Sequence, residues 1–349
     1  MTLPYSSALI GQLLGLATAF CWTVSALSFE EASVRAGSLP VNLIRLVLAF
    51  LLLAGFNWAH RGLPLPTDAT PAQWKWLLLS GLIGFFIGDL CLFRALVLIG
   101  SRTSTLLMSL APLLAALTGY LLLGEQLSTW SWLGMVVTLG GIIWVVSERM
   151  KDGRTDDFEI DDEPSRNPMH DVHDSGAGSA TLIAVQTPVH PGMLRAISPW
   201  GLLLGVLGAA GQGVGLVLAK LGMRGLDGQQ GQYDPFAATQ VRTIAGIASF
   251  AAFVLLAGYG RAVLRALSHR RAMFFTMLGA IAGPFVGVSL LNASVQRIPT
   301  GMAQTLAAIV PVIIIPFVII VKKEHVTLRA FLGALVAVAG VAMLMLGSA

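Results

Sequence analysis

Six ionisable side chains interrupt stretches of sequence that are otherwise almost entirely apolar: Glu30, Arg45, Asp89, Arg94, Lys220 and Arg242. A charge inside a lipid bilayer is costly, so such side chains usually face the protein interior and pair with one another. Glu30, Arg45 and Arg94 lie near one end of their apolar stretches, and Lys220 and Arg242 lie near the opposite end. We therefore hypothesise two gate clusters, one at each face, that make and break ion pairs. The alternative is that these side chains lie at helix ends and reach the water interface.

Asp89 is the acidic residue that lies deepest within an apolar stretch. A carboxyl group at this depth is a candidate carrier of a coupling proton. The alternative is a structural ion pair with Arg94 or with a neighbouring helix.

Polar and aromatic side chains in the middle of the apolar stretches are candidates for contact with a small ligand. Small polar groups beside aromatic rings form pockets for amphipathic molecules, and plain helix packing is the alternative for each residue. The predicted set is Trp22, Ser25, Phe93, Gln212, Asn292 and Gln304. Pro112 and Pro311 are expected to mark kinks or unwound turns, because proline removes a backbone hydrogen bond.

The sequence predicts no cofactor and no metal site. Cys21 and Cys91 lack the spacing of metal ligands. His170 and His173 lie with acidic neighbours in a polar segment, for which solvation is favoured over loose metal binding.

The composition excludes a soluble protein. Of 349 residues, 55% are hydrophobic and 11% are charged, and the mean hydropathy is +0.77, whereas soluble domains carry about 25% charged residues. The net charge of +4 does not indicate nucleic-acid binding, because the basic residues lie in short segments between apolar stretches. The N-terminal MTLPYSS has no basic residue, so we expect the first span to stay in the mature protein. The chain is therefore expected to be an integral, multi-pass membrane protein, located in the inner membrane of a bacterium.

Ten apolar stretches are long enough to cross a bilayer as helices, which takes about 20 residues each. Helices are expected because strands would leave backbone groups unpaired in hydrocarbon. An acidic segment with low apolar content separates the first five stretches from the last five and is expected to be a disordered linker. The predicted domains are 1–147, a linker at 148–197, and 198–349. The spans are near 9–29, 38–58, 75–98, 102–123 and 130–147, then 198–221, 234–257, 271–293, 299–321 and 326–347.

The two halves are diverged copies of one unit. A shift of 197 residues places Arg45 on Arg242, and a shift of 190 places Trp22 on Gln212. Asp89 meets Val288 and has no acidic counterpart. Because five is odd, two copies of one fold in a single chain must be inverted relative to each other. A shift of 199 places Gly84, Gly88, Pro112, Glu125, Gly134 and Gly141 on Gly283, Gly287, Pro311, Glu324, Gly333 and Gly340.

The stretch from Phe93 to Val146 resembles the EamA unit of the drug/metabolite transporter superfamily. The residues that carry the resemblance are Phe93, Arg94, Ala95, Leu96, Pro112, Gly124, Glu125, Gly134 and Gly141. The second half keeps Pro311, Glu324, Gly333 and Gly340, but it reads LNASV in place of FRALV and VKKEHV in place of LGEQLS. The resemblance covers both helical halves and implies an all-α membrane protein of ten transmembrane helices in two inverted five-helix repeats.

The expected function is secondary transport, with export of small organic metabolites such as amino acids by alternating access. The expected partners are a small-molecule substrate, a coupling proton and the lipid bilayer, with no nucleic acid. A lipid flippase, in which Arg45 or Arg242 would meet a phosphate, is the first alternative. An intramembrane enzyme is less favoured, because all the histidines lie outside the apolar stretches. The sequence leaves the oligomeric state open.

Two arguments give opposite orientations. Basic residues are more numerous on the side of the linker, partly because of the predicted interfacial helix GRAVLRALSHRR, and the positive-inside rule then places both termini outside the cell. The resemblance implies that both termini lie inside.

Overall fold

The computed structural model describes residues 4–151, 198–224, 232–317 and 328–347, which form helices and no strands within these ranges. Most of the predicted linker, including His170 and His173, lies outside them, as does Glu324. The first half comprises α1 (Pro4–Ala36), α2 (Ser38–Arg61), α3 (Pro71–Gly81), the π-helical η1 (Leu82–Gly88), α4 (Asp89–Met108), α5 (Ala111–Leu123) and α6 (Thr129–Lys151). The second half comprises α7 (Pro199–Met223), α8 (Pro235–Leu256), α9 (Gly260–Ser268), α10 (Arg270–Ala280), the π-helical η2 (Ile281–Gly287), α11 (Val288–Val295), α12 (Thr300–Ala307), α13 (Val310–Phe317) and α14 (Leu328–Leu346).

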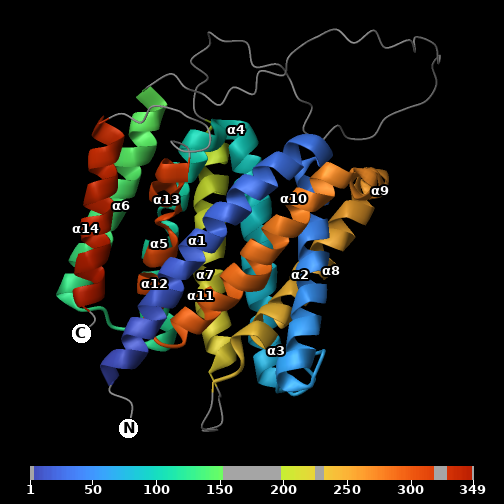
Figure 1. The fold of residues 1–349 in the computed structure, drawn as a ribbon, viewed down its shortest axis with the longest axis horizontal. Coiled ribbons are helices and arrows are strands. Elements are labelled where there is room, and N and C mark those ends of the chain that lie inside the picture. Colours follow the sequence, from blue (N-terminus) through green and yellow to red (C-terminus); the bar gives the residue numbers. More distant parts are fainter. Residues whose placement is uncertain (1–3, 152–197, 225–231, 318–327, 348–349) are drawn as a thin grey trace.

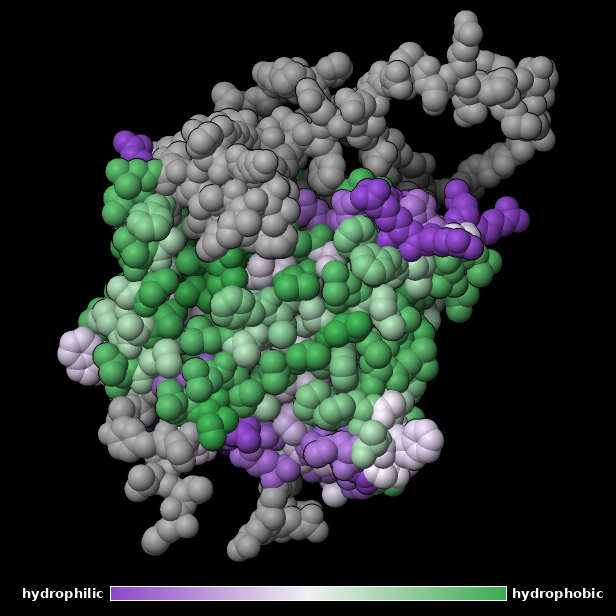
Figure 2. Space-filling model, viewed as in Figure 1, coloured by the Kyte–Doolittle hydropathy of each residue, from purple (hydrophilic) through white to green (hydrophobic). Residues whose placement is uncertain are grey.

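On the side of the molecule seen in Figure 2, a hydrophobic belt lies between hydrophilic residues at its two ends. Large apolar side chains on the belt are exposed, among them Leu121 and Leu256, as expected for a surface that faces lipid tails. Within the described ranges, 8 helical spans are long and apolar enough to cross a membrane, and two shorter apolar helices cover Thr300–Ile314 and Phe331–Leu346. The protein is therefore an integral, multi-pass membrane protein.

The start of α1 and the end of α14 lie at one face of the bundle, here called the terminus face (Figure 1). The end of α6 and the start of α7 lie at the opposite face, here called the linker face. α3 begins at the terminus face and α10 begins at the linker face, so these two helices run in opposite directions.

Irregular backbone occurs at matching positions in the two halves. η1 and η2 each cover seven residues, and their starts at Leu82 and Ile281 are separated by the shift of 199 that the sequence repeat predicts. The same shift relates the breaks at 109–110 and 308–309, which precede α5 and α13. Pro112 and Pro311 therefore each lie in the first turn after a break, where a missing N–H costs least.

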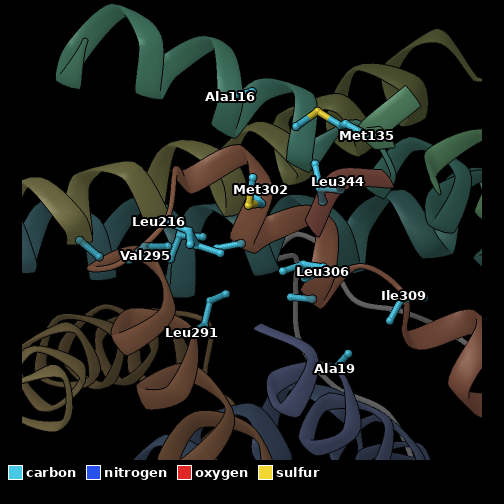
Figure 3. Close-up of a cluster of buried hydrophobic side chains, with 14 of the residues drawn as sticks. Ala19, Ala116, Met135, Leu216, Leu291, Val295, Met302, Leu306, Ile309 and Leu344 are labelled. Carbon is cyan, nitrogen blue, oxygen red and sulfur yellow. The ribbon is translucent and has the colours of Figure 1, made fainter. Parts of the chain in front are cut away.

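Helices of one half pack against those of the other. α1 packs on α10, η2 and α11, while α7 packs on α3, η1 and α4. The pairs α2 with α8, α5 with α12, and α6 with α14 also cross between halves. Figure 3 shows the largest core cluster, in which Met302 and Leu306 of α12 lie among side chains of α1, α6, α7 and α14. The two halves thus share one core.

Three predicted boundaries differ from the structure. The predicted spans 75–98 and 102–123 imply a break between 98 and 102, but the backbone there is helical. The break falls at 109–110 instead, where Ser109 and Leu110 leave the helix ahead of Pro112. α6 continues to Lys151, past the predicted boundary at 147. α1 runs from Pro4 to Ala36, longer than the predicted span, because the flanking sequence has high helix propensity and no internal proline. The predicted basic helix is present as α9, with Arg261 and Arg265 exposed.

Candidate functional site

A buried ion pair joins the two halves at the terminus face. Lys220 Nζ lies 2.6 Å from Glu125 Oε1, and each side chain is only 7% exposed. Lys220 also donates to the carbonyl oxygen of Ile298 at 2.8 Å. Thr300 donates to Glu125 through its backbone N–H at 2.7 Å and through its hydroxyl at 3.0 Å. The pair is therefore supplied with the additional hydrogen bonds that a buried salt bridge requires.

Local sequence places Glu125 in this position. Gly124 ends α5 with a φ of 65°, a left-handed conformation that glycine adopts without strain. The chain then turns back, and the N–H of Glu125 donates to Gly119 O at 3.2 Å. This turn directs the carboxylate to the start of α12, where free N–H groups and the helix dipole favour a negative charge. A cavity of about 340 Å³ lies beside the pair, lined by Tyr120, Glu125, Trp132 and others.

A second ion pair lies deeper in the first half. Arg45 Nη2 donates to Asp89 Oδ2 at 2.6 Å, and Gln212 Nε2 donates to Asp89 Oδ1 at 2.9 Å. The guanidinium of Arg45 also stacks over the ring of Phe29, 5.0 Å from its centroid. Asp89 is only 8% exposed, so its charge is compensated by a neighbouring helix, α2, rather than by Arg94.

Arg242 is the counterpart of Arg45 but has a different environment. Its Nη1 donates to Asn292 Oδ1 at 3.0 Å, and its guanidinium lies 4.7 Å from the centroid of the Phe85 ring. Asn292 in turn donates to the hydroxyl of Thr239, which also accepts from Ser289. Arg242 is only 4% exposed, and no carboxylate of the described residues lies within ion-pair distance of it.

A cavity of about 350 Å³ lies between the end of α1 and the start of α2, and we call it the linker-face cavity. These helix ends lie at the linker face (Figure 1). Its walls combine three apolar side chains, Ala26, Phe29 and Val41, with Phe93 of α4 and with the polar residues Glu30, Ser33, Ser38, Asn42 and Arg45.

The six predicted ligand-contacting residues have different surroundings in the structure. Phe93 lines the linker-face cavity. Gln212 and Asn292 bind charged groups of the protein, as described above. Ser25 donates to Gly279 O at 3.1 Å, and Trp22 lies against the backbone of Gly287. The Oε1 atom of Gln304 is buried and accepts no hydrogen bond from the described residues.

The predicted gate residues separate into distinct places. Glu30 and Arg45 line the linker-face cavity, and Arg45 also pairs with Asp89. Arg94 forms no salt bridge with any residue that the structure describes, so a Glu30–Arg94 pair is not present in this conformation. Lys220 and Arg242 do not meet, because Lys220 pairs with Glu125.

Sequence reasoning did not assign a partner to Glu125, and it overlooked Asn42 and Thr300. The signal for the Glu125 pair was present, because Glu125 directly follows one apolar stretch and Lys220 lies at the end of another, both at the terminus face. In the described ranges, no group of three or more His, Cys, Asp or Glu residues is arranged to hold a metal ion.

Comparisons with known proteins agree with this architecture. One solved structure, described only as a crystal structure of a protein, matches 95% of this chain and 95% of its own with a TM-score of 0.63 and 16% identity. This likeness concerns the fold alone. A probable transport protein of Saccharomyces cerevisiae, YPL264C, is 24% identical over 158 residues, which are 45% of this chain and 42% of the yeast protein. The match thus spans less than half of that relative.

The model of the EamA-like transporter family matches residues 9–147 and 199–346, which together are most of the chain. These two segments contain both irregular π-helical turns, both ion pairs and the buried Arg242. This membrane protein therefore belongs to the EamA-like transporter family.

Proposed function

We propose that the protein is a secondary transporter that exports small organic metabolites by alternating access between two inverted repeats. The observation that carries the proposal is that each face has a cavity beside a buried ion pair. At the terminus face the Glu125–Lys220 pair joins the two halves beside a cavity of about 340 Å³. At the linker face Arg45, which pairs with Asp89, lines a cavity of about 350 Å³. Ion pairs that break and reform at each face in turn would let one face open at a time.

The proposed architecture is ten transmembrane helices, five in each of the units 1–147 and 198–349, joined by the linker 148–197. It is supported by the opposite directions of α3 and α10 (Figure 1) and by the matching positions of η1 and η2. In this proposal the two shorter apolar helices complete the count of ten. Inverted repeats are the common basis of alternating access in secondary transporters.

The proposed roles of the residues follow from their partners. Glu125 and Lys220 form the gate of the terminus face. Asp89 is the candidate for a coupling proton, since protonation would release Arg45 from its carboxylate partner. Arg45 would then be free to bind a substrate group, so protonation of Asp89 and binding of the substrate would be coupled.

We propose export as the direction of transport. The expected bacterial inner membrane remains part of the proposal, although the yeast relative shows that similar proteins are not confined to bacteria.

A lipid flippase would need a basic group that a lipid phosphate reaches from the side. Arg242 is only 4% exposed and packs against Phe85, so it does not meet this requirement in the structure.

Flux measurements in proteoliposomes test the proposal. Purified protein is reconstituted, and exchange and efflux of a metabolite panel are compared with those of protein-free vesicles. We expect at least one solute to show saturable exchange, and we expect Lys220→Met to reduce it. If no solute moves under any imposed gradient, the proposal is wrong.

A further inference from the structure

Two residues that line the linker-face cavity each carry a buried nitrogen donor without an acceptor. Asn42 Nδ2 and Arg45 Nε have no hydrogen-bond partner in the part of the chain that the structure describes. Asn42 is only 2% exposed. A buried donor that lacks an acceptor costs about 1–3 kcal/mol, so two of them in the wall of one cavity require an explanation.

The two donors are adjacent on one helix. Asn42 and Arg45 are three residues apart in α2 and therefore project from the same face. Arg45 is held in position on two sides, by Asp89 through Nη2 and by the ring of Phe29. The bond to Asp89 uses Nη2 and leaves Nε unused, and the Arg45 side chain keeps 19% of its surface exposed.

We propose that the linker-face cavity is a substrate subsite for a small carboxylate-bearing solute, whose oxygen atoms accept hydrogen bonds from Asn42 Nδ2 and Arg45 Nε. Two neighbouring donors, one of them on a guanidinium, match the two oxygen atoms of a carboxylate. The rest of the solute lies against Phe29, Val41 and Phe93, which form the apolar part of the wall. This inference rests on the proposed transport function and names the substrate class for it.

Glu30 lies at the exposed rim of the same cavity. Water at the rim screens its charge, whereas the two donors lie in the buried wall, where hydrogen bonds are strongest. A carboxylate at the wall is therefore favoured over an ammonium group at the rim. A preference for cations would overturn the proposal.

Three probes that share one aromatic body separate these possibilities: phenylacetate, phenylacetamide and phenethylamine. Binding to the purified full-length chain is measured by isothermal titration calorimetry. We expect phenylacetate to bind about tenfold more tightly than the neutral amide, the difference that one charge-assisted hydrogen bond supplies. Phenethylamine is expected to bind most weakly.

Matched variants locate the site. Asn42→Leu and Arg45→Lys are each expected to weaken phenylacetate binding by about tenfold. Asn57→Leu is the control, since Asn57 is a fully buried amide of the same helix that donates to Gln240 and does not line the cavity. If Asn42→Leu does not fold, the test rests on Arg45→Lys. This variant keeps the positive charge beside Asp89 and is therefore expected to fold.

The proposal is overturned if the amide or the amine binds as tightly as phenylacetate, or if both cavity variants bind it normally. Flux assays separate this failure from failure of the proposed function. Saturable transport that phenylacetate does not inhibit contradicts only the carboxylate subsite. Binding that depends on Asn42, without movement of any solute, supports the subsite and contradicts transport.

Discussion

Arg45 and Arg242 are aligned by the sequence repeat, but within the described residues only Arg45 has a carboxylate partner. Asp89 supplies that partner 2.6 Å away in the first half. The equivalent of Asp89 in the second half is Val288, and Arg242 instead donates to the neutral amide of Asn292. At these aligned positions the two halves therefore differ in electrostatics.

Introducing the missing carboxylate tests this relationship. If the repeats place their side chains equivalently, Val288→Asp will pair with Arg242. Val288→Asp should then lower the free energy of unfolding in both backgrounds, but by at least about 2 kcal/mol less in wild type than in Arg242→Met. Thermal unfolding of the four proteins of this cycle in detergent provides the measurement. Equal costs in both backgrounds would show that the two positions are not equivalent in space.

The Glu125–Lys220 pair should dominate the stability of the terminus face. Lys220→Met leaves the Glu125 carboxylate buried without its cation, a change that typically costs about 3–5 kcal/mol. The exposed pair Glu31–Arg35 is the control, because surface pairs contribute below about 1 kcal/mol. The unfolding temperatures of Lys220→Met and Arg35→Met give the comparison. Similar losses in the two variants would contradict the role of burial.

Two adjacent glycines of α6 should respond differently to a larger side chain. A Cβ atom at Gly141 would lie 2.7 Å from Ala337 Cα of α14, whereas a Cβ atom at Gly140 would meet nothing within 4 Å. Gly141→Leu should therefore destabilise the α6–α14 pair by about 1–3 kcal/mol or more. Gly140→Leu should be neutral or stabilising, since leucine favours helix. The reverse order of the two unfolding temperatures would show that α6 is rotated relative to this structure.

Tyr233 gives a prediction for pH dependence. Its hydroxyl donates to Asp68 Oδ1 at 3.1 Å, and Asp68 also pairs with Arg61 at the end of α2. Burial, followed by the charge of Asp68, raises the pKa of Tyr233 above its usual value. A raised pKa means that the stabilising contribution is complete below the unfolded pKa of about 10 and is lost as the pH rises further. The stability difference between wild type and Tyr233→Phe should thus be constant up to about pH 9 and shrink above pH 10. A difference that grows over this range would contradict the assigned hydrogen bond.

The sequence predicted an all-helical membrane protein because long apolar stretches recur along the chain, and 8 of the described helical spans are long enough to cross a membrane. Long apolar stretches define helices, and Gly84, Gly88 and Pro112 recur in the second half at a constant shift. The same shift relates η1 to η2, although π-helical turns themselves leave no distinct sequence pattern. The locations of the helices were therefore predictable from the sequence, whereas the π-helical turns within them were not.

Side-chain partners were less predictable. Helices such as α1 and α5 are apolar on all sides, so hydropathy does not determine how each helix is rotated about its axis. Asp89 has Arg94 nearby in sequence, yet its partner is Arg45 of another helix. Glu125 and Lys220 belong to different halves, and only the packing of α5, α7 and α12 brings them together.

The central claim is that the two faces open alternately. Ser33→Cys lies in the linker-face cavity, and Thr300→Cys lies behind the Glu125–Lys220 pair, where Thr300 is fully buried. Each is introduced singly into a chain with Cys21 and Cys91 replaced by alanine, and labelling by a membrane-impermeant thiol reagent is measured with and without a transported solute. The account predicts that the solute lowers labelling at Ser33→Cys and raises it at Thr300→Cys. Labelling that rises at both positions together, or that stays unchanged at both during flux, would contradict alternating access.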